Sequence, residues 1–159
     1  MPLLFYRGAY QMPQDENPVA ILKEILETNN WTYSWEDCIY DYHHYHSTAH
    51  EAIVITRGSA RIQFGGPGGI TLQADVGDVF IIPAGVAHKR IDSAENFTCV
   101  GAYPAGQKYD MNYGETGERP ATDTNIKKLP LPENDPLYGN DGPLNKNWFS
   151  QRDQVTTLL

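Results

Sequence analysis

The histidines of this chain are unevenly spaced. Four of the five, at positions 43, 44, 46 and 50, lie within eight residues of one another, and the fifth is His88. Histidine is the commonest metal ligand because its neutral imidazole offers a lone pair near pH 7. In a strand, residues two apart point to the same side, so the rings of His44 and His46 can share one space. The cluster therefore indicates a metal site, although a single strand histidine is more often a hydrogen-bonded or partly exposed side chain.

A carboxylate and a third imidazole can complete this site. Glu51 stands at the head of the apolar run Ala52–Thr56. If that run is the next strand, its first residue lies at the same end of the sheet as the two histidines. His88 follows a short turn containing proline and glycine, which redirects the chain into another strand. Three imidazoles and one carboxylate suit one divalent transition metal per chain (iron, manganese, nickel, zinc or copper) and leave positions for water or substrate.

The choice between two neighbouring ligands stays open at this point. Adjacent strand residues face opposite ways, so Glu51 and His50 cannot both reach the metal easily. A turn can rotate the pair, which keeps His50 as an alternative ligand. His43 is out of phase with His44 and is expected to be structural or exposed.

Other side chains could contact a substrate in the same cavity. Arg90 shares the strand parity of His88 and could bind a substrate carboxylate through two hydrogen bonds. The alternative is a surface arginine with a buried stem. Tyr40 and Tyr42 share the parity of His44 and could line the pocket, although tyrosine in a barrel interior more often serves packing.

One helix is expected near the N-terminus. Asn17 suits the N-cap and Pro18 the first helical position, where its missing N–H is no loss. The apolar residues that follow share one face. Asn29-Asn30 ends the helix, and we expect it to pack against a sheet. The residues of the apolar face are Ile21, Leu22, Ile25 and Leu26.

From Trp31 onward the chain consists of short β-prone runs separated by turns, with no helical pattern between them. Many short strands with glycine and proline punctuation predict a sandwich or barrel, here an all-β core of about residues 31–104. A glycine-rich turn occupies residues 65–69. The runs are Trp31–His46, Ala52–Thr56, Ala60–Phe64, Ile70–Ala74, Val79–Ile82, His88–Ile91 and Phe97–Tyr103.

Residues 105–149 hold many prolines and glycines but also many tyrosines and leucines. A disordered tail would be poorer in such side chains. We therefore expect an extended arm that lies over the barrel or over a neighbouring subunit, with residues 150–159 as a frayed tail. A chain of 159 residues (1–159) fits a single domain that needs no disulfide bonds.

Composition narrows the function classes. The net charge of −8 argues against nucleic-acid binding, which requires a basic face. No apolar run approaches the roughly 20 residues of a membrane span, and the N-terminus lacks the features of a secretory signal. We therefore expect a cytoplasmic protein with no membrane partner. Cys38 and Cys99 have no C-x-x-C spacing and are expected to be reduced and buried.

Two segments resemble the two motifs of the cupin family. Residues 44–51 with Gly58 match H-x-H-x(3,4)-E-x(6)-G, and residues 77–88 match G-x(5)-P-x-G-x(2)-H, at full spacing and in order. Two positions depart from the family. The glycine six positions before the first histidine is Cys38 here, and the asparagine that often ends the second motif is Asp92. Neither position is a metal ligand in the family.

The resemblance implies an RmlC-like jelly roll, also called a double-stranded β-helix. It favours Glu51 over His50 as the fourth ligand, and cupins commonly form dimers, for which the arm would suit the interface. Nearly the full length is similar to an uncharacterised bacterial subgroup of single-domain cupins, labelled YjlB-like. That similarity rests on residues 44–51, 101–107 and 130–144, and the subgroup has no settled reaction.

Three functions compete. The first is a metal-dependent enzyme, of dioxygenase or isomerase type, that acts on a small organic molecule. The second is a non-catalytic module that binds a small ligand or a metal. The third is a metal-independent sugar epimerase on the same fold, against which the four intact ligand positions argue. Analogy at the level of the fold cannot choose the reaction.

Overall fold

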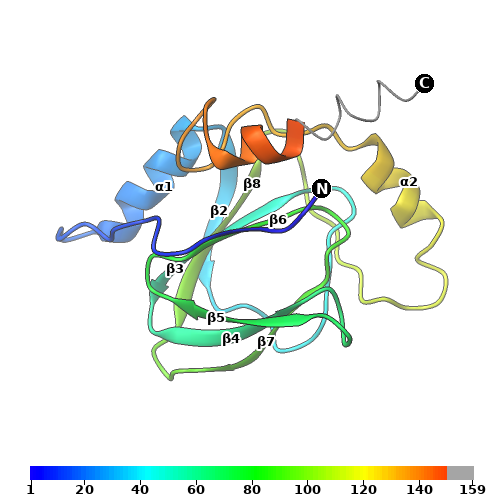
Figure 1. Cartoon of the computed structure of the whole chain (residues 1–159), viewed down its shortest axis with the longest axis horizontal. Coiled ribbons are helices and arrows are strands. Elements are labelled where there is room, and N and C mark those ends of the chain that lie inside the picture. Colours follow the sequence, from blue (N-terminus) through cyan, green and yellow to red (C-terminus); the bar gives the residue numbers. More distant parts are fainter. Residues whose placement is uncertain (150–159) are drawn as a thin grey trace.

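Two antiparallel sheets face each other in the computed structural model, which describes residues 1–149 (Figure 1). The larger sheet has the strand order β1-β6-β3-β8-β2, and the smaller one has the order β5-β4-β7. This jelly-roll sandwich confirms the predicted fold class. The expected tail, residues 150–159, lies outside the described residues. The strands are β1 (Leu4–Tyr6), β2 (Trp31–Asp37), β3 (Glu51–Arg57), β4 (Ser59–Phe64), β5 (Ile70–Asp75), β6 (Val79–Ile82), β7 (His88–Ser93) and β8 (Thr98–Pro104).

The larger sheet is covered on both faces. Along β3, Ala52 and Val54 belong to an outer core with the helix and the arm, whereas Ile53 and Ile55 belong to an inner core between the two sheets. This alternation is the ordinary period of a strand. It decides the direction of each residue at the start of β3, because Glu51 has the parity of Ile53.

The predicted helix, α1 (Pro18–Thr28), is confirmed. The Asn17 side chain caps it by accepting a hydrogen bond from the Ala20 N–H at 3.2 Å. Leu22 and Leu26 are fully buried in the outer core, so α1 covers part of the larger sheet. None of the helices within residues 1–149 is long and apolar enough to cross a membrane.

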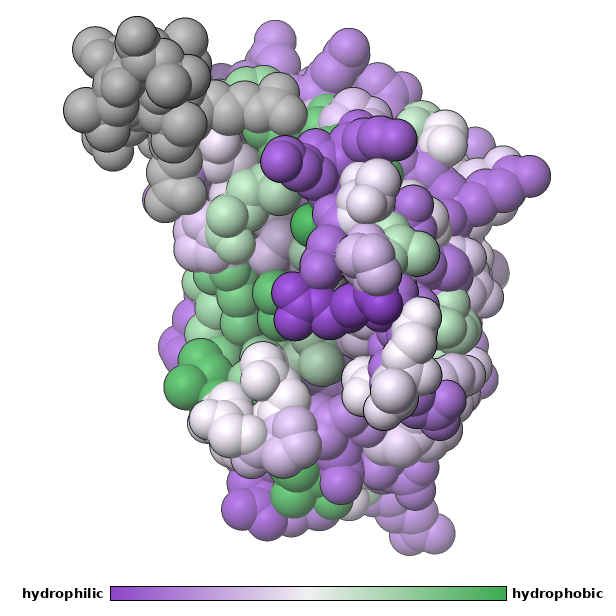
Figure 2. All heavy atoms as spheres, turned by 90° about the vertical axis from the view of Figure 1, so that its right-hand side faces the viewer, coloured by the Kyte–Doolittle hydropathy of each residue, from purple (hydrophilic) through white to green (hydrophobic). Residues whose placement is uncertain are grey.

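The arm is less extended than the sequence predicts. It contains a second helix, α2 (Ala121–Lys128), and a short π-helical segment, η1 (Asn145–Phe149). Only Thr122 of α2 is buried and no side chain caps it, so the sequence carries neither of the usual helix signals. Figure 2, which looks at the side of the molecule where α2 lies in Figure 1, shows mostly hydrophilic residues with a band of hydrophobic ones.

A buried carboxylate fastens the arm to the larger sheet. Asp135 has no exposed surface and accepts four hydrogen bonds, so both of its oxygens are engaged. Two later arm residues, Leu144 and Trp148, complete the outer core. The donors are the Tyr6 hydroxyl at 2.7 Å and the backbone N–H groups of Leu137, Tyr138 and Leu144 at 2.9, 3.2 and 3.1 Å.

Both cysteines are free, as the sequence predicts, but only Cys99 is buried. The expectation of burial is wrong for Cys38, which follows the end of β2 at the rim of the sandwich. Its thiol donates to the Phe97 carbonyl at 3.0 Å, while Cys99 donates to the Asp37 carbonyl at 3.2 Å. These contacts give both thiols a structural role.

Candidate metal centre

Three imidazoles converge at one end of the space between the sheets. His44, His46 and His88 are buried, and the ligand atoms they offer all lie within 4.8 Å of one another. His44 is brought to β7 by an antiparallel bridge, in which its N–H donates to the His88 carbonyl at 3.2 Å and the His88 N–H donates back at 2.9 Å. The segment before β3 and the start of β7 thus form one ligand platform.

Backbone carbonyls orient all three rings. The Nδ1 of each imidazole lies within hydrogen-bond distance of a carbonyl oxygen, which can only accept. Each Nδ1 must therefore carry the proton, and each Nε2 keeps its lone pair for a ligand bond. Such contacts typically fix a metal-binding histidine. They run from His44 to Tyr42 at 3.2 Å, from His46 to Asp110 at 2.6 Å and from His88 to Val86 at 3.2 Å.

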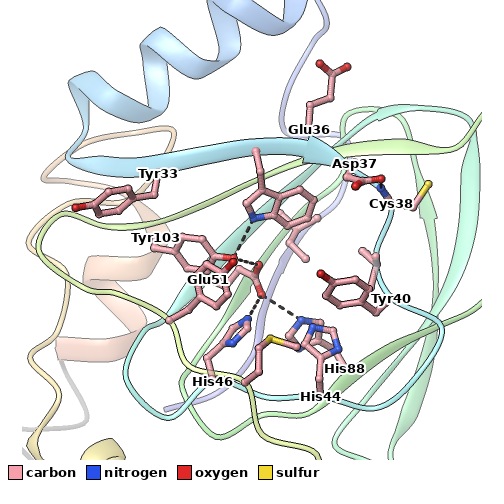
Figure 3. A pocket seen from close by; sticks show the side chains of 15 residues that line it. Tyr33, Glu36, Asp37, Cys38, Tyr40, His44, His46, Glu51, His88 and Tyr103 are labelled. Carbon is pink, nitrogen blue, oxygen red and sulfur yellow. Dashed lines mark hydrogen bonds and ion pairs between the residues drawn. The ribbon is translucent and has the colours of Figure 1, made fainter.

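The Glu51 carboxylate lies beside these nitrogens (Figure 3). Its Oε2 is 3.3 Å from the Nε2 of His46 and 3.1 Å from the Nε2 of His88. With the ring protons on Nδ1, neither Nε2 donates to this buried oxygen, which has no hydrogen-bond partner. A buried carboxylate oxygen without a hydrogen bond is costly in a protein interior. The donor set of three imidazoles and one carboxylate fits a divalent cation, which would satisfy that oxygen.

Burial and charge keep His44 neutral and Glu51 ionised, and they favour the protonated form of His46 while no metal is bound. Burial and the neighbouring His88 lower the pKa of His44 to about 4, so its ring is neutral at pH 7. Burial favours the protonated form of Glu51, but the contacts with His46 and His88 outweigh it and hold its pKa below the ordinary value. Burial likewise opposes protonation of His46, yet Glu51 and Asp110 raise its pKa overall. The pocket thus stabilises a carboxylate anion.

Two further side chains hold the other oxygen of Glu51. The Tyr103 hydroxyl donates to Oε1 at 3.1 Å and accepts from the Trp35 indole N–H at 3.0 Å. Burial and the nearby carboxylate raise the pKa of Tyr103 well above its usual value, so it remains a donor. These two hydrogen bonds hold the carboxylate through Oε1, so Oε2 is the oxygen that faces the imidazoles.

A β-bulge explains why Trp35 reaches this site. The pairing of β2 with β8 shifts register between Thr32 and Trp35, and Tyr33 adopts a φ of 52° there. Trp31 packs in the outer core, whereas Trp35 contacts the inner core, although the two share strand parity. The extra residue of the bulge therefore reverses the direction of Trp35. The indole lies directly against Gly101, where an added Cβ would come within 2.1 Å of it.

A cavity of about 290 Å³ opens above the imidazoles. Glu51, Trp35 and Tyr103 form part of its wall (Figure 3). Its remaining lining consists mostly of aromatic and apolar residues, with two acidic residues. These are Tyr33, Glu36, Asp37, Cys38, Ile39, Tyr40, His44, His46, Ile53, His88, Tyr109 and Met111.

His50 lies on the other face of the sheet from Glu51. Its Nδ1 accepts a hydrogen bond from the Ala84 N–H at 3.0 Å, and its ring contacts Trp148 at 5.0 Å between centroids. Burial lowers its pKa to about 4. The structure thus brings Glu51, and not the alternative ligand His50, to the three imidazoles.

Of the remaining candidate contact residues, one lines the cavity and the others do not. Tyr40 lines the cavity and stacks on Tyr42, which is not among the lining residues. Arg90 does not line the cavity either, because its guanidinium donates to the Ile39 carbonyl at 3.0 Å and to the Ser93 hydroxyl at 3.1 Å. His43 is half-buried and lies outside the imidazole cluster.

Several residues of the site escaped the sequence reasoning. Asp110 orients His46 through its carbonyl, and its carboxylate accepts from the N–H groups of Ser47 and Thr48. It lies more than sixty residues along the chain, so no local pattern connects it with them. Tyr103 lies two residues after Gly101 in β8, so both face the inner side of the sheet. This strand alternation was the one sequence signal for its position.

Comparison with known proteins agrees with this architecture. The Cupin family profile matches residues 42–104. The chain is 40% identical over 147 residues to the uncharacterized protein YjlB of Bacillus subtilis (strain 168), covering 92% of this chain and 86% of that protein.

Two solved structures illustrate the more distant similarity. Acireductone dioxygenase from Bacillus anthracis, with a cadmium ion in its active centre, is 12% identical, with a TM-score of 0.47 over 70% of this chain and 83% of that one. Procruciferin, an 11S globulin from Brassica napus, is 16% identical, with a TM-score of 0.42 over 50% of this chain. The chain spans about a fifth of that globulin, 22%. On its motifs, fold and full-length relative, the chain belongs to the cupin family, within the uncharacterised YjlB-like group.

Proposed function

We propose that the chain is a metal-dependent enzyme, of dioxygenase or isomerase type, that acts on a small organic molecule. One divalent transition metal would be held by His44, His46, Glu51 and His88. The observation that carries this proposal is the anchoring of all three Nδ1 atoms by carbonyls, which leaves three Nε2 lone pairs beside a buried carboxylate oxygen that has no hydrogen bond. A structural histidine cluster would instead spend those atoms on internal hydrogen bonds.

The residues of the chain prepare the site before any substrate arrives. The carbonyls hold the rings in one orientation, and Tyr103 fixes Oε1 of Glu51. A bound divalent ion would supply a Lewis acid next to the cavity. A bound molecule that displaced water from the aromatic wall would meet stronger electrostatic interactions there.

Metal analysis tests the binding part of the proposal. Protein repleted with iron, manganese or zinc and then desalted is expected to retain about one ion per chain. His88→Ala and Glu51→Ala should each remove most of it. The matched control is His43→Ala, which deletes a neighbouring histidine outside the cluster and should leave the metal content unchanged. A parent protein without metal, or a control that loses as much metal as His88→Ala, would contradict the site.

Catalysis needs a separate test. The iron- and manganese-loaded proteins should consume oxygen, or interconvert isomers detectable by NMR, with a substrate from a screen of small organic molecules. His88→Ala should abolish this turnover. The alternative is a non-catalytic ligand-binding module, and it would be favoured by thermal shifts with small molecules in the absence of any turnover.

A further inference from the structure

The cavity above the imidazoles narrows the class of substrate. We infer that its ligand is a small, flat organic molecule that reaches the metal through oxygen atoms at one end and carries no second anionic group. This inference rests on the proposed function, because the metal is the partner of the oxygen end. It follows from the shape, the lining and the charge of the cavity.

Aromatic rings flank the metal site on two sides. Tyr103 and Tyr109 stack with centroids 4.7 Å apart and planes 23° apart, and both contact the ring of His46. Tyr40 lies 5.2 Å from the ring of His44, edge to face. Figure 3 places Tyr103 and Tyr40 on opposite sides of Glu51. A flat molecule that binds above Glu51 would therefore meet tyrosine rings on both sides, which favours aromatic or other planar groups.

The polar groups of the cavity wall offer no positive charge to an anionic substituent. The Tyr103 hydroxyl is already engaged with Glu51 and Trp35. Ile39, Ile53 and Met111 contribute apolar atoms to the lining, and the other tyrosines that line it offer only neutral hydroxyls. A ligand body placed here would give up its water without gaining new ion pairs, and this favours an uncharged body.

The charges around the cavity also disfavour an anionic group on the ligand. Among the described residues that line it, there is no lysine or arginine, and the charged residues beyond Glu51 are Glu36 and Asp37. Arg90 does not line the cavity, and its guanidinium is held by bonds to Ile39 and Ser93. A carboxylate or phosphate remote from the metal would thus be desolvated next to acidic groups.

The size of the cavity sets a further limit. Its volume of about 290 Å³ lies at the lower end of the range of about 300–1,000 Å³ for sites of drug-sized ligands. One ring with a few substituents fits this volume. A larger ligand such as an oligosaccharide would have to extend beyond the cavity.

Three probes with the same chelating end test the inference. Catechol, dopamine and 3,4-dihydroxybenzoate share two adjacent hydroxyl groups but carry a neutral, cationic or anionic tail. Zinc-loaded protein, in which the metal has no redox chemistry, is titrated with each probe by calorimetry. We expect catechol and dopamine to bind, and 3,4-dihydroxybenzoate to bind about tenfold more weakly or worse, since its carboxylate finds no partner.

A charge-adding variant makes this comparison internal to the protein. Tyr40 is 52% exposed at the cavity edge, so an arginine fits there without entering the core. Tyr40→Arg should bring the affinity for 3,4-dihydroxybenzoate close to that for catechol. Tyr40→Gln, the uncharged control, should keep the discrimination of the parent. Loss of the tyrosine ring affects binding of both probes, so the ratio of the two affinities within each variant reports the effect of the added charge.

The outcomes separate the two proposals. A protein that binds no zinc contradicts the proposed function before any probe is added. Zinc-loaded protein that binds none of the three probes, or that binds 3,4-dihydroxybenzoate as tightly as catechol, contradicts the substrate class alone. Failure of Tyr40→Arg to improve binding of the anionic probe contradicts the role assigned to charge at the cavity edge.

Discussion

Two buried carboxylates on opposite faces of the larger sheet differ in how fully they are hydrogen-bonded. Asp135, on the arm side, accepts four hydrogen bonds. Glu51, on the inner side, has one oxygen bonded to Tyr103 and the other left without a hydrogen bond between two imidazoles. Burial alone is nearly the same, at 0% and 3% exposure. Internal satisfaction therefore distinguishes a structural carboxylate from one that is available to a ligand.

The same contrast holds for the histidines. The Nδ1 of His50 accepts from the Ala84 N–H, so the one lone pair of its neutral ring is occupied, and its Nε2, which has no hydrogen-bond partner, carries the proton. The rings of His44, His46 and His88 have only their Nδ1 positions engaged, and those bonds go to carbonyls. Internal partners on the inner side thus orient side chains without occupying the atoms that would bind a metal.

The largest effect is expected on the arm side. Asp135→Ala leaves several donors without an acceptor in a fully buried position, so the free energy of unfolding should fall by about 3 kcal/mol. The melting midpoint should drop by about 10 °C. Chemical denaturation and calorimetry measure these changes. The folded fraction should still bind the same amount of metal per chain, and loss of metal by folded protein would show that the two faces are coupled.

Glu51→Gln should have the opposite effects, a large loss of metal affinity and a small change in stability. The amide keeps the shape and the acceptor for Tyr103 but removes the charge, so metal affinity should fall by about 100-fold or more. The free energy of unfolding of the metal-free protein should change by less than about 1 kcal/mol. Competition with a chelator measures the affinity, and urea denaturation measures the stability. A loss of stability as large as that of Asp135→Ala would mean that Glu51 is a structural carboxylate after all.

Tyr103→Phe is a milder perturbation of the same carboxylate. The ring can still stack on Tyr109, but Oε1 of Glu51 loses its donor and the Trp35 N–H loses its acceptor. Metal affinity should fall by about tenfold, as is usual when a ligand loses its orienting partner. Chelator competition at fixed pH measures the change. Unaltered affinity would show that Tyr103 only packs in the cavity wall and does not position Glu51.

The smallest effect is expected at Arg90. Arg90→Met keeps much of the stem and removes the bonds to Ile39 and Ser93, at a cost of about 1 kcal/mol in the free energy of unfolding. Affinities for zinc and for catechol should stay unchanged, since Arg90 does not line the cavity. Calorimetric titration checks both affinities. A clear loss of catechol binding would restore Arg90 as a ligand contact, as its strand parity suggests.

Parts of the sequence prediction remain untested. The dimer and the cytoplasmic location stay predictions, as does the organisation into a single domain with a terminal arm. The arm itself was interpreted only in outline. Its aromatic and leucine content indicated packing, but α2 lacks a cap and a buried face, and so gave no helical pattern.

The sequence by itself was enough to predict the fold class and to identify the candidate metal donors. Strand alternation predicted one side for His44 and His46, and glycine and proline marked the turns. The predicted run to His46 was too long, however, because β2 ends at Asp37 and His44 is held by an isolated bridge to His88. The choice of Glu51 over His50 could not be derived in this way, because a turn precedes β3 and either parity was open.

Only the tertiary structure decided what surrounds the donors. A bulge in β2 turned Trp35 inward against its parity, and Asp110 came from a distant segment to hold His46. The pairing of Glu51 with Tyr103 depends on the inner faces of β3 and β8 meeting side by side. Local patterns fix the direction of a side chain along its own strand, but contacts between segments far apart in sequence depend on register and packing across the whole sandwich.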